Sequence, residues 1–223
     1  MIEQNVKELL LKVPKKNKFD ENVTIVAAVK LQTVQNINRA IKAGISDIGD
    51  NHVQEFKDKY DEIVGNPRRH FIGHLQTNKV KYLLGKVHLY HSVDRFNLAE
   101  ELSKRSVNAG VTSNILVQIN IGNEESKGGF EYDEAEKAVE AISKLPALKI
   151  KGLMAMLPFI DDEGELRRLA KKMRALYDKL KDYYSFEYLS MGMSGDFKLC
   201  VEEGSNMIRV GTSIFGQRAS KAN

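Results

Sequence analysis

The amino-acid sequence predicts an α/β fold: a single (β/α)8 barrel of the TIM type with an extra N-terminal helix. Two observations support this prediction. Short apolar segments alternate with amphipathic helical segments along the chain, a pattern typical of parallel strands joined by crossover helices. Eight such segments fit within 223 residues, near the lower end of the size range of these barrels. A doubly wound open sheet remains an alternative, because alternation alone does not show that the sheet closes.

The chain has the size and composition of one globular domain. It is 42% hydrophobic and 29% charged, so we expect residues 1–223 to form a single domain. No apolar run reaches the ~18 residues that a bilayer span needs, and we expect no membrane segment. The one cysteine, Cys200, excludes an internal disulfide and is compatible with a reducing compartment. The N-terminal segment carries acids among its apolar residues, unlike a signal peptide, so we expect a cytoplasmic protein.

The charge is mildly basic, with a formal net charge of +4. Acidic and basic residues are interleaved along the chain rather than collected in a tail or stripe. This pattern is typical of a solvated surface, and we expect no nucleic-acid binding. A small anionic ligand suits the balance better than a long polyanion.

The N-terminal elements follow from apolar spacing. A helix is predicted over Glu3–Leu11 and the first strand over Val23–Val29. Thr33 is a candidate cap of the next helix, which Gly44 closes. The apolar positions of that helix are Val34, Ile37, Ala40 and Ile41.

The remaining strands and helices repeat this alternation. The other predicted strands are Ile45–Gly49, His70–Gly73, Val87–Val93, Ile115–Ile121, Ile150–Ala155, Tyr188–Met191 and Met207–Val210. Asp133 and Glu136 resemble a capping box before a helix whose buried stripe is Ala135, Ala138, Val139, Ile142 and Leu145. The longest predicted helix has the stripe Leu166, Leu169, Met173, Leu176 and Leu180, which covers too few heptads for a coiled coil.

The first predicted strand, within "VTIVAAVKLQ", ends on Lys30. Lysine is rarely buried without a partner, so from this stretch alone the simpler interpretation is that the strand reaches solvent there. In a (β/α)8 barrel, however, functional residues lie at the C-terminal ends of the strands. The predicted fold therefore makes Lys30 a candidate functional residue.

Two hydroxyl–glycine pairs lie where such barrels commonly bind phosphate, after the seventh and eighth strands. Ser194 and Gly195 are predicted to open a short helix after the seventh strand, and Gly211 and Thr212 follow the eighth. Each pair alone is also typical of an ordinary turn. Together, at these positions, they predict a phosphate site built from hydroxyls and bare backbone.

Arg209 lies inside the last predicted strand, where it stays charged and needs an acceptor. A buried carboxylate and a ligand atom are both open as that acceptor. A lysine, a phosphate site and an arginine at one barrel mouth suit a ligand with an aldehyde, a phosphate and an acceptor nitrogen. Pyridoxal 5′-phosphate has all three groups.

The chain resembles the pyridoxal phosphate homeostasis protein family, single-domain relatives of the alanine racemase barrel. The resemblance runs through nearly the whole length in the motifs "AAVK", "GDNHVQE", "HFIGHLQTNK", "HSVDR", "VQINIGNEESKGGF", "KGLMAM", "SMGMSGDF" and "MIRVGTSIFG". It implies a Schiff-base lysine at Lys30, an asparagine beside the pyridine ring at Asn51, and a pyridine-nitrogen partner at Arg209. It also implies phosphate contacts at Ser194, Gly195, Gly211 and Thr212.

Three positions depart from the family pattern. Val29 stands where the family usually has serine, Thr33 where it has proline, and Asp50 where it has glutamate. These differences leave the lysine intact and concern the shapes of the first and second loops.

The resemblance implies a binding protein that holds pyridoxal phosphate as a lysine aldimine and serves its intracellular homeostasis. Buffering the cofactor and delivering it to apo-enzymes that require it both fit this role. An amino-acid racemase-like enzyme is the alternative, and a lysine-dependent aldolase without cofactor is a weaker one. Racemisation needs two bases, and similar racemases take the second, a tyrosine, from a partner chain's additional domain. This chain ends soon after "FGQR", so we expect a monomeric binding protein with no catalytic residue.

His88 and His91 raise the question of a metal site. A spacing of three residues on a strand points the two side chains to opposite faces. We therefore expect no zinc pair and no other metal site.

Overall fold

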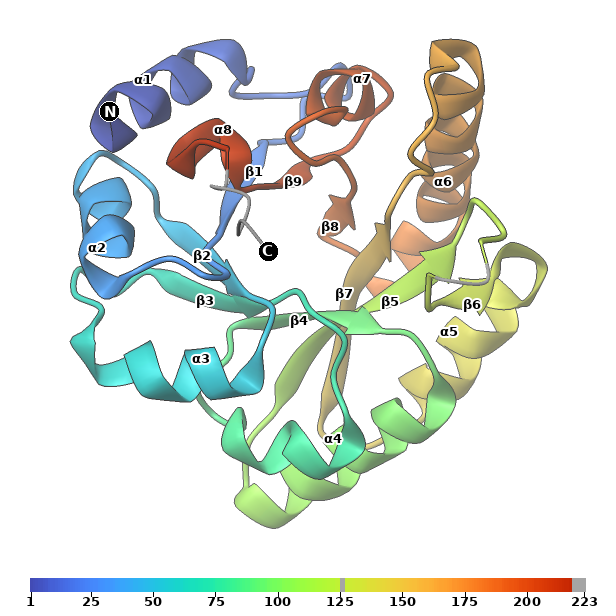
Figure 1. Ribbon diagram of the computed structural model, residues 1–223. Coiled ribbons are helices and arrows are strands. Elements are labelled where there is room, and N and C mark those ends of the chain that lie inside the picture. The colour runs from blue at the N-terminus through green and yellow to red at the C-terminus, as the bar shows by residue number, and fades with distance from the viewer. Residues whose placement is uncertain (125–126, 218–223) are drawn as a thin grey trace, which may run out of the picture.

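The computed structural model describes residues 1–124 and 127–217 of the chain. Its barrel strands are β1 (Thr24–Ala28), β2 (Asp47–Asp50), β3 (Arg68–Phe71), β4 (Leu89–Val93), β5 (Ser113–Asn120), β7 (Leu148–Ala155), β8 (Tyr188–Ser190) and β9 (Met207–Val210). All of them pair in parallel. Pairing of β1 with β9 and of β4 with β5 closes the ring, which confirms the barrel and rules out the open sheet (Figure 1).

Helices surround this ring. The α-helices are α1 (Ile2–Lys12), α2 (Val34–Lys42), α3 (Val53–Lys59), α4 (Phe96–Ala109), α5 (Ala135–Ser143), α6 (Glu163–Tyr184), α7 (Phe197–Glu202) and α8 (Thr212–Phe215). Three 3-10 turns are η1 (Tyr60–Glu62), η2 (Thr77–Tyr82) and η3 (Tyr132–Glu134), and the short strand β6 (Phe130–Glu131) pairs with β5 outside the ring. Among the described residues, no helix combines the length and apolar character that crossing a membrane requires.

Apolar side chains fill the barrel interior and the space between the barrel and its helices. The interior cluster draws one residue from each of five strands: Val26, Leu89, Leu116, Met154 and Met207. Residues that alternate with them along the strands pack outward against the helices, as strand geometry requires. The interior is therefore packed, and a ligand must bind at one end of the barrel.

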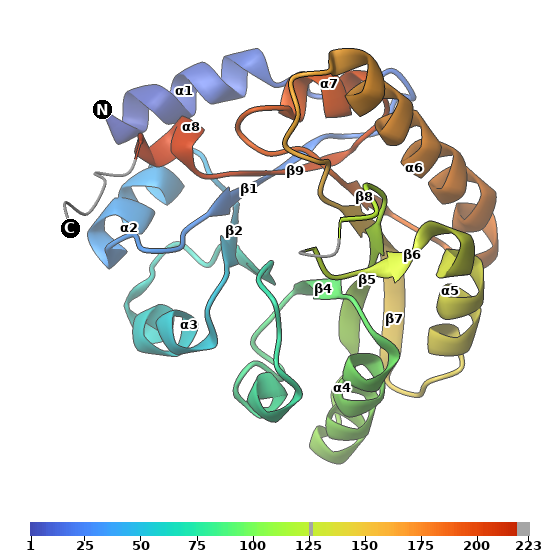
Figure 2. The same ribbon diagram turned by 45° about the vertical axis from the view of Figure 1, so that its right-hand side comes forward.

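The extra N-terminal helix packs beside the last short helix. Figure 2 shows α1 lying along α8, and the Asn5 Nδ2 amide donates a 2.9 Å hydrogen bond to the Ile214 carbonyl. Since Thr212 is the first residue of α8, this contact braces the backbone at one of the predicted phosphate positions.

Most predicted elements are confirmed, with boundaries that shift by a few residues. Thr33 caps α2, because its Oγ1 accepts a 3.2 Å hydrogen bond from the Asn36 N–H. The predicted capping box at Asp133 is wrong: that residue lies in η3, and α5 begins only at Ala135, without a side-chain cap. The 3-10 turn takes the place of the expected first helical turn.

The helix predicted to open at Ser194 and Gly195 begins later, at Phe197. The Met193 N–H donates a 2.6 Å hydrogen bond to Asp196 Oδ1, which closes a turn across Ser194 and Gly195 before the helix starts. Both residues keep their place after β8, but in a turn.

Candidate functional site

A pocket of about 530 Å³ opens beyond the C-terminal ends of β1, β7, β8 and β9. It brings together six of the seven predicted site residues: Lys30, Ser194, Gly195, Arg209, Gly211 and Thr212. These residues come from three separate parts of the sequence. Closure of β9 onto β1 places the last segments beside the first one.

Lys30 lies in the turn between β1 and α2, two residues beyond the end of the strand. The turn is held on both sides of the lysine. The Val29 N–H donates to the Gly49 carbonyl at 3.0 Å, and the Leu31 N–H donates to Glu55 Oε2 at 2.8 Å. Leu31 has a φ of 61°, a left-handed conformation that turns the chain sharply after the lysine. The half-buried Lys30 side chain therefore lines the pocket from a fixed backbone.

Arg209 is buried, 6% exposed, on the pocket wall. Its Nη1 donates to the carbonyl and the Oγ of Ser190 at 2.9 and 2.6 Å, and its Nη2 donates to the Ala155 carbonyl at 3.0 Å. Burial lowers the pKa of Arg209 from 12.5 to about 10, which leaves it a cation at neutral pH. Within the described part of the chain, no carboxylate forms an ion pair with it. The structure thus decides against the buried carboxylate partner that the sequence left open.

The loops after β8 and β9 meet at the hydroxyl of Ser194. Its Oγ accepts long hydrogen bonds from the Gly211 N–H at 3.3 Å and from the Ser213 N–H at 3.4 Å. A Cβ at Gly195 would meet nothing within 4 Å, so its backbone is open to the pocket. Two backbone donors, hydroxyls and bare backbone in one corner form a concavity suited to an anion.

Asn51, the seventh predicted residue, lines a neighbouring pocket of about 380 Å³ instead. Ala28 pairs with Gly49, so Lys30 and Asn51 each follow that pair by two residues, just beyond the ends of two adjacent strands. The Asn51 Oδ1 atom is buried, and no hydrogen bond within the described residues satisfies it. A buried amide oxygen of this kind needs a partner, which a ligand at the mouth could supply.

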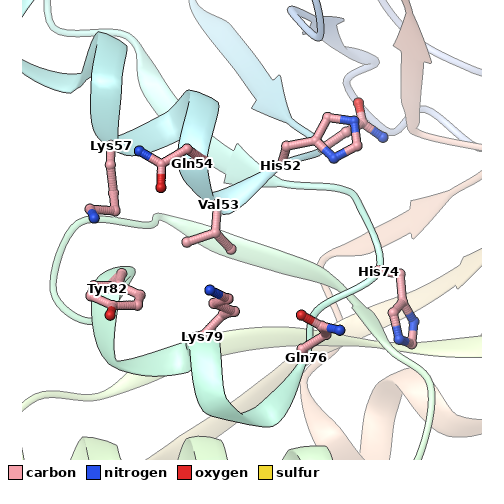
Figure 3. Close-up of a pocket in the computed structure, with 9 residues that line it drawn as sticks. His52, Val53, Gln54, Lys57, His74, Gln76, Lys79 and Tyr82 are labelled. Carbon is pink, nitrogen blue, oxygen red and sulfur yellow. The ribbon is translucent and has the colours of Figure 1, made fainter.

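The neighbouring pocket lies between α3 and η2, as Figure 3 shows. Lys57 from α3 lies over the Tyr82 ring at 4.5 Å, and Lys79 lies 6.0 Å from the same ring. His52 and His74 also line this pocket, and none of the described residues that line it carries a carboxylate. The side chains of both lysines are exposed.

Lys127 is a pocket residue that the sequence analysis missed. Its Nζ donates to the Leu157 carbonyl at 2.9 Å and forms an ion pair with Glu124. Lys127 lies in "SKGG", soon after the long fifth strand. Its position after the C-terminal end of a barrel strand was the one sequence feature that pointed to the pocket. Leu157 and the fully exposed Phe159 add an apolar wall to the same pocket.

The predicted arrangement of His88 and His91 is wrong. His88 precedes β4 rather than belonging to it, so strand alternation does not separate the two rings. Both rings pack against His70, with centroid distances of 5.5 and 5.1 Å. Among residues 1–124 and 127–217, no group of three or more potential ligands could hold a metal ion.

Comparison with known proteins identifies similar chains. The family described as alanine racemase, N-terminal domain, matches residues 2–219. A pyridoxal phosphate homeostasis protein of Aquifex aeolicus is 41% identical over 197 residues, which cover 87% of this chain and 86% of that protein. The protein of the same name from Escherichia coli K12 is 35% identical over 203 residues, covering 89% of this chain and 87% of that protein.

A solved structure shares the fold closely. PipY of Synechococcus elongatus PCC7942, determined with PLP bound, is 28% identical and superimposes with a TM-score of 0.85. The match covers 97% of this chain and all of that one. The barrel described above is therefore the same fold that holds PLP in that protein.

Proposed function

Since the chain belongs to the alanine racemase N-terminal domain family and, within it, to the pyridoxal phosphate homeostasis proteins, we propose that it binds pyridoxal 5′-phosphate at the mouth pocket. We further propose that it holds the cofactor on Lys30 and serves intracellular homeostasis of the cofactor, by buffering it or by delivering it to apo-enzymes.

Arg209 carries this proposal. It is a buried cation on the wall of the pocket that Lys30 also lines, and no described carboxylate pairs with it. A guanidinium has five N–H donors, and only three are accounted for by the bonds to Ser190 and Ala155. The Nε–H and one Nη2–H make no hydrogen bond to the described residues. A pyridine nitrogen is an acceptor that fits these donors.

The corner around Ser194 fits the phosphate of the cofactor. The Gly211 and Ser213 N–H groups donate weakly to Ser194 at more than 3.2 Å, so an anionic oxygen would be a better acceptor for them. Thr212 lines the same pocket and carries a further hydroxyl. The donor set therefore matches a phosphoryl group.

Lys30 supplies the amine for covalent attachment. The Lys30 Nζ would hold the cofactor by condensing with its aldehyde group, with release of water. When bound, the cofactor supplies an aldehyde carbon and a π-system that withdraws electrons. The rigid turn after β1 keeps the lysine at the pocket while the phosphate corner fixes the other end of the ligand.

The residues around the pocket support a binding role rather than turnover. Arg209 donates hydrogen bonds but accepts none, so beside the ring nitrogen it favours the unprotonated pyridine and weakens the electron sink that carbanion chemistry needs. Lys127 is held by Glu124 and by the Leu157 carbonyl, and Asp196 accepts the Met193 N–H. These contacts occupy two of the pocket side chains that could otherwise act as a second base.

The test compares binding and chemistry on one preparation. Purified protein is mixed with pyridoxal phosphate or with pyridoxal, and the visible absorbance of the lysine adduct is recorded with dialysis between readings. We expect retention of the phosphate form alone. The α-proton exchange of alanine in heavy water is then followed by NMR. Exchange and racemisation at about 1 per second or faster would contradict the binding role and favour the racemase-like alternative.

The oligomeric state and the cellular location belong to the same proposal. We propose that residues 1–223 act as one monomeric domain in the cytoplasm, where reducing conditions keep a single cysteine unpaired. Light scattering coupled to size exclusion tests the monomer, for which the expected mass is that of one 25.2 kDa chain.

A further inference from the structure

Five polar side chains form a continuous hydrogen-bonded series inside the barrel. Asp47 Oδ1 lies 2.9 Å from His70 Nε2, and His70 Nδ1 lies 2.9 Å from His91 Nε2. His91 Nδ1 lies 3.2 Å from Ser190 Oγ, which accepts the 2.6 Å bond from Arg209. Each of the five is at most 6% exposed. The series runs from β2 through β3 and β4, then across to β8 and β9.

Strand alternation places this series on the inner face. His91 lies two residues after Leu89, and Arg209 two residues after Met207; both apolar residues belong to the interior cluster. A Cβ on Gly49, two residues after Asp47, would meet side chains of the interior. The polar series therefore forms a layer next to the apolar core of the barrel.

When both imidazoles are neutral, the chemistry of the two ends fixes the direction of every bond. Arginine only donates, so the Ser190 oxygen accepts from it. At the other end, burial acts to raise the pKa of Asp47, but hydrogen bonds from His70, Arg68 and Ser46 outweigh burial and hold that pKa below its usual range. Asp47 is thus an anion that only accepts, and His70 Nε2 must donate to it.

The remaining bonds follow from these ends. His70 donates through Nε2, so as a neutral ring it accepts at Nδ1 from the His91 Nε2–H. His91 then accepts at Nδ1 from the Ser190 hydroxyl. Burial, together with the charge of Arg209, lowers the pKa of His91 well below its usual value, consistent with a neutral ring. Every bond in the series points from Arg209 toward Asp47.

We propose that Asp47, His70, His91 and Ser190 are positioning residues for Arg209: their ordered series orients the guanidinium and links it to a counter-charge on the far side of the barrel interior. The carboxylate is thereby kept out of the ligand pocket. Arg209 keeps its Nε–H and one Nη2–H for a ligand acceptor. The link to the cofactor rests on the function proposed above, whereas the hydrogen-bond order does not.

Other charged groups face the series and must be considered when it is titrated. Arg68 forms a two-pronged ion pair with Asp47 at 2.7 and 2.8 Å. The Ser46 hydroxyl donates to the same carboxylate at 2.6 Å. The His88 ring packs against His70, and burial lowers the pKa of His88. Burial raises the pKa of Tyr188 on β8, and the charge of Asp47 acts in the same direction.

The first test reads the histidine tautomers in the ¹⁵N-labelled protein without added cofactor, by long-range ¹H–¹⁵N NMR at pH 7.5. We expect His70 and His91 both neutral and both protonated at Nε2. An Nδ1–H tautomer or an imidazolium at His91 would overturn the proposal on the wild-type protein alone, whatever the stability of any variant.

The second test removes the link next to Arg209. Ser190→Ala should change the Nδ1 resonance of His91 and, through it, the ring resonances of His70. The matched control is Ser106→Ala, which removes another buried serine hydroxyl, bonded to Ser113 at 2.8 Å, outside the series. The control should leave both rings unchanged. If the ring resonances of His91 and His70 do not change in Ser190→Ala, the proposed hydrogen-bonded series is wrong.

The third readout connects the series with the ligand. Loss of a hydrogen bond to Arg209 should weaken retention of pyridoxal phosphate about threefold to tenfold in Ser190→Ala and alter the pH dependence of its absorbance, with no change in Ser106→Ala. Unchanged absorbance in Ser190→Ala, with the cofactor bound, would overturn the positioning role. If the wild-type protein shows the expected tautomers but binds no cofactor, the proposed function fails and the hydrogen-bond order stands.

Discussion

At the scale of single residues, Ser194 and Thr212 bring hydroxyls from two loops to one corner of the pocket at the barrel mouth. The Ser194 Oγ accepts the Gly211 and Ser213 N–H groups in this corner.

The phosphate corner gives a prediction at this scale. The double substitution Ser194→Ala and Thr212→Ala should weaken retention of pyridoxal phosphate by tenfold or more, since each charge-assisted hydrogen bond contributes about 1.5–3 kcal/mol. Equilibrium dialysis measures the change. Ser143→Ala is the control, because the Ser143 hydroxyl donates to the Glu140 carbonyl on the surface and should not matter. Equal retention of pyridoxal and its phosphate by the native protein would show that the anion site lies elsewhere.

Asp50, one of the departures from the family pattern, gives a prediction about pH. Burial raises the pKa of Asp50 from 3.8 to about 6, although Arg69 and Lys59 act to lower it. The folded protein therefore binds more protons than the unfolded chain between about pH 4 and 6, so this carboxyl makes stability fall as pH rises through that window.

Asp50→Asn removes the cost of the buried charge. We expect the variant to be more stable than the native protein above pH 6, by at most about 3 kcal/mol, and to lose this advantage near pH 4. Urea unfolding at several pH values measures the difference, with the exposed Asp61→Asn as control. A stability gain that does not depend on pH would contradict the assignment.

Among the site residues, Lys30, Ser194 and Thr212 were predictable from the sequence, because each follows a strand whose direction and place in the barrel came from the apolar pattern. Lys127 looked like an ordinary solvated lysine, because its place after the fifth strand does not show whether its side chain enters the pocket.

At the scale of elements, strands were easier to predict than the segments between them. An apolar run predicts a buried strand well. At Asp133, however, sequence spacing does not distinguish a capping box from the 3-10 turn that the structure has there. For the same reason, α7 was predicted to begin too early: the Asp196 carboxylate closes a turn before the helix starts. Turns depend on which of several competing local hydrogen bonds is most stable, and several residues can supply it.

Gly152 in β7 tests the pairing of strands. It has a φ of +146°, and a Cβ there would lie 1.8 Å from the carbonyl oxygen of Tyr188 on β8. Gly152→Ala must push the two strands apart, and we expect a loss of about 3 kcal/mol or more in the free energy of unfolding. The comparison is Gly110→Ala at the end of α4, where φ is +64° and nothing lies within 4 Å of a Cβ.

For Gly110→Ala the expected loss is about 1–2 kcal/mol, because only left-handed strain is added. Thermal and denaturant unfolding of both variants measure the difference. Equal losses at the two sites would mean that β7 and β8 are not packed as closely as described.

For the whole molecule, alternation of apolar and amphipathic segments predicted the barrel, and the eight parallel strands confirm it. The alternation could not show closure, which depends on pairing between β4 and β5 as well as between β1 and β9. Nor could it show the series from Asp47 to Arg209, whose members lie in five different strands. The two histidines of the series, His70 and His91, lie 21 residues apart, and the segment "HLYHSV" contains only the second of them.

The central claim is that Lys30 holds pyridoxal phosphate, and peptide mapping after borohydride reduction tests it most directly. The native protein is loaded with cofactor, reduced, digested and analysed by mass spectrometry, with Lys30→Arg as the matched variant that keeps the charge. We predict the reduced pyridoxyl label on the peptide carrying Lys30 and its loss in the variant. A label mainly on Lys127, the other lysine lining the described pocket, or an equal label in Lys30→Arg, would contradict the account.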